Sequence, residues 1–213
     1  MSINQLYTTL TSTEIIDRTI NPLLRVGTIT TGNLVAGSVL GKVNTSVGTP
    51  TYGAENVGDG TIGTISLGAQ AFGGIYRLEC IDIDPSTLFK LTSPMGNVIS
   101  EAIAVGSQQT TTHLVFTLTQ GNNDDFAVGD LIFVPVLAGN YKLSASAAGD
   151  GSAVPSAILI NDVDATSAPT EALILTFGAV FKNALIFGTG HSIGTTEDTL
   201  RQRGIHFSDL VLI

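Results

Sequence analysis

The chain is poor in cysteine, tryptophan and charged residues. Cys80 is the single cysteine, so no internal disulfide can form, and we expect it to be a small buried residue. Tryptophan is absent and only 13% of the residues are charged, which argues against a bundle of solvated helices. By contrast, 24 glycines indicate frequent turns, and a hydrophobic fraction of 43% is enough for a buried core. This composition favours a protein made of short β-strands.

Basic residues are also scarce. Lys and Arg total 9 against 18 Asp and Glu, which gives a net charge of −9. Because nucleic-acid phosphates and anionic membrane surfaces both attract basic proteins, we expect neither as a partner. Apolar runs such as LIFVPVLA are far shorter than the roughly 20 residues that span a membrane. The N-terminus lacks the basic start and apolar centre of a secretory signal, so we expect a soluble protein made in the cytoplasm.

From Arg25 onward the sequence consists of short β-branched segments separated by glycine-containing turns. We expect strands at residues 63–67, 75–83, 88–91, 113–118 and 131–137. Many short strands at even spacing are typical of a small sandwich or barrel.

The net negative charge is concentrated in one part of the chain. Residues 55–139 contain two basic and nine acidic residues, a net charge of −7, and so carry most of the total of −9. A separate acidic β module over this range is the simplest account. The residues that follow are the most apolar of the chain. They lead to a helix that we expect to have Thr195 as N-cap and Asp198 at its third position, and to stop at Gly204, before a last strand.

The N-terminal segment allows two interpretations. Residues 1–22 are polar and end at Pro22, which stops any preceding helix. Thr11 and Glu14 have the spacing of a capping box, which predicts a short helix over residues 12–19. The alternative is an extended arm that becomes ordered on a partner. The second interpretation is favoured, because so short a helix is marginal on its own.

Two motifs suggest enzymes. GDGTIG, at 58–63, matches a dinucleotide-binding fingerprint, which requires a helix after the glycines. The residues that follow alternate as in a strand and predict no helix, so we interpret the motif as a glycine-rich turn. GHSIG, at 190–194, matches a nucleophile elbow with Ser192 as nucleophile. The acid and base of such an esterase would have to come from one short stretch after the serine: Glu197, Asp198, His206 and Asp209. That fold needs further βα units, so we expect a loop before a capped helix and no enzymatic activity.

Acidic pairs could offer oxygens to a cation. Asp82 with Asp84, and Asp162 with Asp164, lack the spacing and bend glycine of a calcium loop. The three histidines form no zinc pattern. We therefore expect solvated turns, with neither a metal nor a cofactor.

Several segments in a fixed order resemble the head decoration proteins of tailed bacteriophages, the family of the lambda decoration protein. NLVAGSVLGKV resembles an early strand pair of that family. YKLSASAAGDGSAVPSAIL resembles its Lys-Leu strand, Asp-Gly turn and following apolar strand. LTFGAVFKNALIF, a short helix, Gly204-Ile205 and a final strand complete the pattern.

The resemblance implies a mainly β fold: a decoration-protein β core with one short C-terminal helix, plus an inserted small β-sandwich or barrel. The β core would comprise residues 24–54 and 140–213, the insert 55–139, and a capsid-engaging arm 1–23. The protein would lie on the outer surface of the virion capsid, as a homotrimer at three-fold positions, bind the major capsid protein, stabilise the shell and have no enzymatic role.

Site residues follow from this picture as expectations. The arm residues expected to bind the capsid are Thr13, Glu14, Ile15, Ile16, Asp17, Arg18 and Ile20. The apolar strand expected to form trimer contacts comprises Ala157, Ile158, Leu159 and Ile160, because one small sheet would not cover it. The alternative function is an outward-facing adhesion module in which residues 55–139 bind a host glycan or protein.

Overall fold

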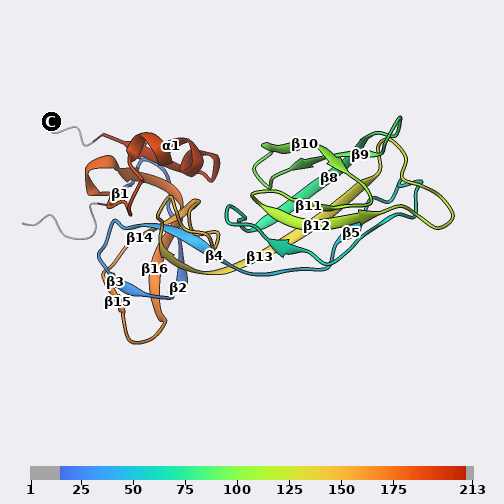
Figure 1. Cartoon of the computed structure of the whole chain (residues 1–213). Helices are drawn as coiled ribbons and strands as arrows, with labels where there is room; N and C mark the ends of the chain where they lie inside the picture. The colour runs from blue at the N-terminus through green and yellow to red at the C-terminus, as the bar shows by residue number, and fades with distance from the viewer. Residues whose placement is uncertain (1–14, 210–213) are drawn as a thin grey trace, which may run out of the picture. The chain divides into compact units, whose positions relative to one another are not determined.

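The computed structural model describes residues 15–209 (Figure 1). The chain forms two compact units. Unit 1 comprises Met1–Lys42, Asn140–Ala148 and Ser152–Ile213, and unit 2 comprises Val43–Gly139 and Gly149–Gly151. Over the described residues the mainly β fold with one short α-helix near the C-terminus, expected from the sequence, is confirmed.

Unit 1 is a closed barrel with additional short elements packed against it. Its elements are β1 (Ile16–Asp17), β2 (Leu23–Ile29), β3 (Gly32–Leu34), the first part of β4 (Val39–Val47), the last part of β13 (Leu131–Leu143), β14 (Pro155–Leu159), β15 (Val163–Ala165), β16 (Thr170–Phe181), the 3-10 turn η3 (Lys182–Ala184), α1 (Ile193–Gln202) and β17 (Ile205–Ser208). Five strands close the ring in the order β16, β14, β4, β13 and β2, because β2 pairs with both β13 and β16.

Two apolar clusters hold unit 1 together. Alternate residues of the barrel strands point inward, and Ile29, Tyr141 and Ile174 meet inside the ring with their neighbours. The outward-pointing residues of β14 and β16 pack beneath α1 and β17, where Leu200 and Ile205 cover them. Both faces of the central strands are therefore buried by the same chain.

Unit 2 consists of two packed sheets. One contains β5 (Thr51–Tyr52), β8 (Gly74–Asp82), β9 (Leu88–Thr92), β10 (Val98–Ala104) and the first part of β13. The other contains β6 (Thr61–Ile62), β7 (Ser66–Leu67), β11 (Gln108–Thr110) and β12 (Leu114–Thr119). Tyr76 and Phe89 from the first sheet meet Phe116 from the second in a single core. Buried positions alternate with less buried ones in β8, β12 and the first part of β13, which explains why these segments form strands.

Strands β4 and β13 are neighbours and pass through both units. The Ser144 N–H donates to the Val39 carbonyl at 2.9 Å, and the Gly48 N–H donates to the Pro135 carbonyl at 2.7 Å. Residue numbers rise along one strand as they fall along the other, so the two strands are antiparallel. The first junction between the two compact units lies within β4, between Lys42 and Val43.

Two local predictions need correction. Only Ser66–Leu67 (β7) of the range 63–67 forms a strand, and a separate short strand, Thr61–Ile62 (β6), precedes that range. Helix α1 begins earlier than expected, with Ser192 as N-cap and Thr195 as the reciprocal member of the capping box. Its expected stop is confirmed, because Gly204 has a φ of +80° directly after the C-cap residue.

The less favoured interpretation of the N-terminal segment, a helix over residues 12–19, does not hold for the described part of that range. Residues 12–14 lie outside the described residues. From Ile15 to Thr19 the chain forms strand β1 and a turn. The edge of β16 supplies hydrogen bonds that a helix of this length would have to replace with internal ones.

Candidate functional site

The beginning of the described chain is bound to the end of β16. The Phe181 N–H donates to the Ile15 carbonyl at 3.0 Å, and Ile16 and Asp17 pair with Val180 and Ala179. Ala179 also pairs with His206 of β17, so β1 and β17 flank β16 on opposite edges. β1 is thus an integral strand of unit 1.

The side chain of Ile15 belongs to the core of the protein. It is 5% exposed and packs in the cluster that contains Val39, Ile158 and Leu200. Ile15 was expected to bind the capsid, and in this structure its side chain is already buried by its own chain.

The other predicted arm residues differ in exposure. Ile16, Asp17 and Ile20 are half-buried and Arg18 is exposed. Thr13 and Glu14 lie outside the described residues. Arg18 and Ile20 therefore remain available for contacts with a partner.

A turn fixes the chain after β1. The Thr19 N–H donates to Oδ1 of Asp17 at 2.9 Å. This hydrogen bond, followed by one from the Ser208 hydroxyl, holds the pKa of the Asp17 carboxyl below its ordinary value, against a small opposing effect of burial. Ser208 pairs with Phe181, the residue that also binds Ile15. Residues from both ends of the described chain thus meet at one end of β16.

The predicted trimer-contact strand lies inside unit 1. Ala157 and Leu159 point into the barrel, whereas Ile158 and Ile160 pack under α1 and β17. Ala157, Ile158 and Leu159 are fully buried and Ile160 is 9% exposed. The reasoning that one small sheet would leave this strand uncovered is therefore wrong, because the closed barrel covers one face and α1 with β17 covers the other.

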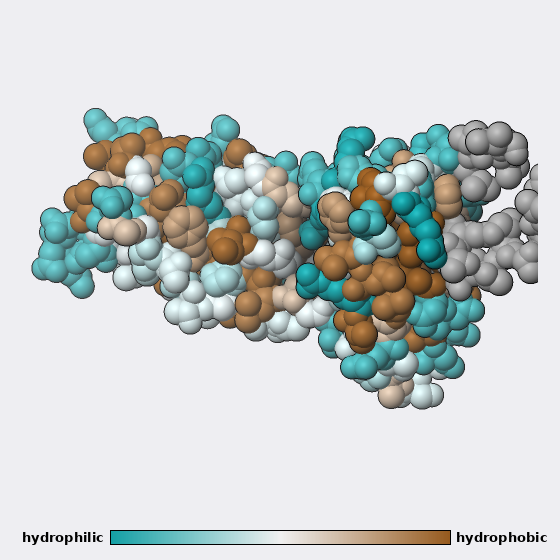
Figure 2. Space-filling view, turned by 180° about the vertical axis from the view of Figure 1, so that it is seen from behind, coloured by the Kyte–Doolittle hydropathy of each residue, from teal (hydrophilic) through white to brown (hydrophobic). Residues whose placement is uncertain are grey.

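An apolar area is exposed elsewhere on unit 1. Figure 2 shows hydrophobic side chains gathered over the region where Figure 1 places β2 and β16. Val26 is 67% exposed and Leu24 is 37% exposed, and Val26 pairs with the half-buried Leu173. We call Leu24, Val26 and Leu173 the β2–β16 apolar surface. It is the outer face of the barrel beyond the part that α1 and β17 cover.

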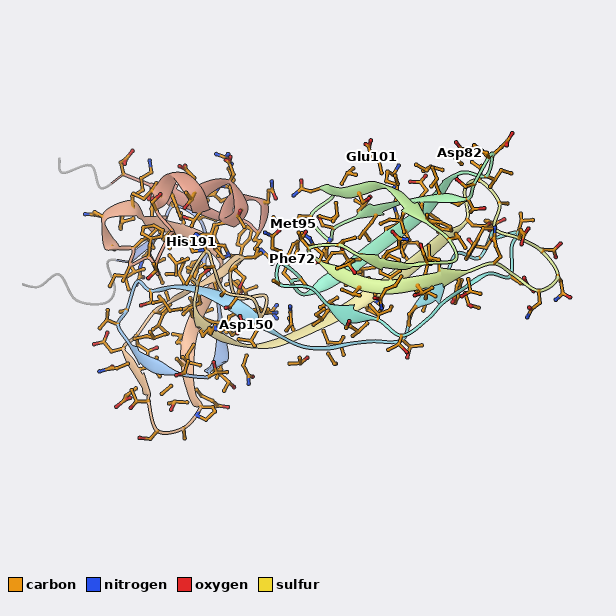
Figure 3. All side chains as sticks on the ribbon, in the orientation of Figure 1. Phe72, Asp82, Met95, Glu101, Asp150 and His191 are labelled. Carbon is orange, nitrogen blue, oxygen red and sulfur yellow. The ribbon has the colours of Figure 1, made fainter. Side chains whose placement is uncertain are left out.

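Ser192 serves as a helix cap. Its backbone N–H donates to Oγ1 of Thr195 at 2.8 Å within the capping box. Nε2 of His191, which Figure 3 shows beside the start of α1, lies 3.0 Å from the Ala153 carbonyl. Within residues 15–209 no histidine forms a hydrogen bond with Ser192. The loop before a capped helix that the sequence predicted is confirmed.

The glycine-rich segment 58–63 binds a protein carboxylate. Asp130 is 2% exposed, and its two oxygens accept hydrogen bonds from the N–H groups of Val57, Gly58 and Ala127 at 2.8–3.0 Å. A short strand, Thr61–Ile62, lies within the segment, and a second strand, Ser66–Leu67, follows it in place of a helix. Asp130 was not identified from the sequence, because a buried carboxylate in a turn has the same local pattern as an exposed one.

The other acidic pairs accept hydrogen bonds from nearby backbone. Oδ1 of Asp162 accepts from the Ala36 N–H at 2.8 Å, and Oδ1 of Asp164 accepts from the Thr166 N–H at 3.0 Å. Oδ1 of Asp82 accepts from the N–H groups of Ile83 and Asp84. Within residues 15–209 no group of three or more His, Cys, Asp or Glu could hold a metal ion.

Unit 2 carries nearly all of the net charge. It contains two basic and ten acidic residues, a net charge of −8 out of −9 for the chain. Figure 3 shows Asp82 and Phe72 at opposite ends of this unit, with Glu101 on β10.

Near Phe72, the ring of His113 packs against Phe72 and Tyr76 with centroid separations of 5.8 and 5.9 Å. Burial lowers the pKa of His113 below its ordinary value.

Comparison with known proteins identifies one family that matches this chain. The family model described as Bacteriophage lambda head decoration protein D matches residues 23–206, which include every strand of the unit 1 barrel. No curated protein sequence matches the chain. A crystal structure of FlgL from Xanthomonas campestris is similar over 49% of this chain and 33% of that chain, with 17% identity and a TM-score of 0.35. A similarity this low carries no inference. In the described part of the chain, no helix has the length and apolar character needed to cross a membrane.

Proposed function

The chain belongs to the bacteriophage lambda head decoration protein family, and from this membership we propose that it binds the outer surface of a phage head as a homotrimer at three-fold positions and stabilises the shell. A general role in capsid decoration follows from the family itself. The observation that carries the finer proposal is the extent of the match, from residue 23 to residue 206. It includes both sequence-separated parts of the barrel and the unit inserted between them.

The proposed contact with the major capsid protein involves the segment that enters β1. Ile15 fixes the beginning of the described chain to unit 1, beside the end of β16. A segment held in this way can add a strand to a neighbouring sheet, because main-chain hydrogen bonds supply affinity with little sequence demand. In this proposal Thr13, Glu14, Arg18 and Ile20 contact the capsid, and Ile15 acts as the internal anchor.

The proposed trimer uses the β2–β16 apolar surface. Val26 and Leu24 are large apolar side chains that are exposed on the same surface. Exposed apolar side chains that lie together favour association between copies, because association removes them from water. Three copies placed around an axis would each bind the shell weakly, and their connection would raise the total affinity through effective concentration.

Unit 2 is proposed to face away from the shell. With a net charge of −8 it would repel other particles and keep crowded heads dispersed. The adhesion function remains the second candidate, because unit 2 has a complete hydrophobic core of its own and could carry an independent binding surface.

Removal of residues 1–14 tests the proposed capsid contact. The truncated protein retains Ile15 and β1, so its melting transition should match that of the full chain. Its co-sedimentation with purified heads should fall by at least tenfold at equal protein concentration. A full-length variant with residues 1–14 in shuffled order controls for chain length and composition. Undiminished attachment of the truncated protein would contradict the proposed contact.

A further inference from the structure

One end of the unit 1 barrel contains a cavity of about 390 Å³. Each of the five barrel strands contributes to its lining, as does the residue that follows α1: the lining residues are Leu23, Arg25, Lys42, Tyr141, Ser156, Thr176 and Arg203. Mouths of β-barrels are common places for small-ligand sites, and this volume is within their usual range. All of the lining residues belong to unit 1.

The charge of this cavity is opposite to that of the chain. Three of the nine basic residues, Arg25, Lys42 and Arg203, line it, whereas none of the 18 acidic residues does. Within residues 15–209, none of these three cations forms an ion pair with a carboxylate. Positive charges that converge without a counter-charge repel one another, so an anion would relieve this repulsion.

Arg203 provides a second, independent observation. Its Nε atom is buried, and the described residues contain no hydrogen-bond acceptor for it. Burial lowers the pKa of its guanidinium below the ordinary value, with an opposing effect of Tyr141. A buried donor without a partner is costly, and a bound acceptor would remove that cost.

The fold holds Arg203 over the barrel end. α1 ends at Gln202, and the positive φ of Gly204 turns the chain into β17, which pairs with β16. A Cβ on Gly204 would lie 2.4 Å from the Phe177 ring, so only glycine allows this close approach. The backbone of Arg203 is therefore held between the end of α1 and the pairing of β17 with β16.

Tyr141 lines the cavity together with the three cations. Nζ of Lys42 lies 5.5 Å from the centroid of its ring. Burial raises the pKa of the Tyr141 hydroxyl, with a smaller opposing effect of Arg25 and Arg203, so the hydroxyl stays neutral and can donate a hydrogen bond.

We propose that the barrel mouth of unit 1 is a binding site for an oxyanion, a phosphate or carboxylate group held by Arg25, Lys42 and Arg203. Planar guanidinium groups match the oxygens of both groups, and a small anion fits the volume. A free anion and an acidic side chain of a neighbouring protein present the same oxygens to this site.

Titration with inorganic phosphate, at ionic strength held constant with sodium chloride, tests the proposal. The readout is the side-chain Nε–H resonance of Arg203 in a ¹⁵N correlation spectrum, which Arg203→Gln identifies by its loss. The resonance should shift saturably, and Arg25→Gln should weaken the apparent affinity roughly tenfold, because it removes one charged hydrogen bond. Arg201→Gln is the matched control, since Arg201 lies on α1 outside the cavity and pairs with Asp198.

The outcomes separate the possibilities. Saturable binding of acetate but not phosphate would support the site and restrict it to carboxylates. If phosphate releases protein from heads, and Arg25→Gln does so too, the natural occupant is an acidic side chain of the capsid. If phosphate binds without affecting attachment, the occupant is a free anion. The proposal is overturned if neither anion shifts the Arg203 resonance, or if Arg25→Gln and Arg201→Gln weaken binding equally.

Discussion

Replacement of Ile15 by alanine tests whether this side chain contributes to the stability of the fold or to attachment to the phage head. Ile15 is 5% exposed and packs against the outer cluster of the barrel, so its truncation leaves a cavity that backbone pairing of β1 prevents from closing. Loss of a buried isoleucine side chain costs about 2–5 kcal/mol. For a domain of this size that cost corresponds to a decrease in Tm of roughly 10–20 °C.

Urea unfolding and thermal melting measure this effect, and co-sedimentation with heads below the melting range measures attachment. We expect Ile15→Ala to lower the midpoint of unfolding, with an unchanged slope, and to leave attachment intact because the side chain faces the protein interior. Ile20→Ala is the matched control. Its half-buried side chain should change stability by less than about 1 kcal/mol, whereas attachment should weaken if Ile20 contacts the capsid. Unchanged melting of Ile15→Ala would refute the assignment of this residue to the core.

Val26→Asp should prevent trimer formation in sedimentation velocity without lowering the Tm, because Val26 is 67% exposed, and Val57→Asp, at an equally open position in unit 2, should have no such effect. A Val26→Asp protein that remains trimeric would place the contact elsewhere. Replacement of residues 43–139 by a two-residue turn should leave a folded barrel that still binds heads, because β4 and β13 are antiparallel neighbours at the junction; a folded product that fails to bind would assign unit 2 to the binding surface. For His113, burial holds the folded-state pKa below the ordinary value, so the unfolded state takes up a proton first as the pH falls. Stability should therefore decrease below about pH 6.5, and His113→Gln, but not His206→Gln, should reduce this dependence in melting experiments from pH 7.5 to 5.5.

Period-two alternation allowed much of unit 2 to be predicted from the sequence. β8, β12 and β13 alternate because one face of each covers the core. β10 was not predicted, because Ile103 is its only fully buried residue and Ser100 and Glu101 interrupt the pattern. An edge strand with one inward anchor has no strong periodicity to detect.

The errors in unit 1 have a different cause. The run from Ala157 to Ile160 is apolar on both faces, and a sequence cannot distinguish coverage by the same chain from coverage by another copy. Ile15 presented the same ambiguity, since its burial depends on β16, more than 160 residues away in the chain. The cations of the barrel mouth are equally scattered, at positions 25, 42 and 203, and no local motif joins them.

Because β4 and β13 continue from one unit into the other, the barrel could carry another domain inserted between these two strands. Where the two strands leave unit 1 they are adjacent, so their chain ends are separated by about 5 Å, the ordinary distance between neighbouring strands. Any domain whose own first and last residues lie side by side could be spliced in at Lys42 and Asn140 without stretching the barrel. A head carrying such grafts would present a foreign antigen or enzyme in many regularly spaced copies, with each cargo secured by two covalent connections rather than one flexible tether.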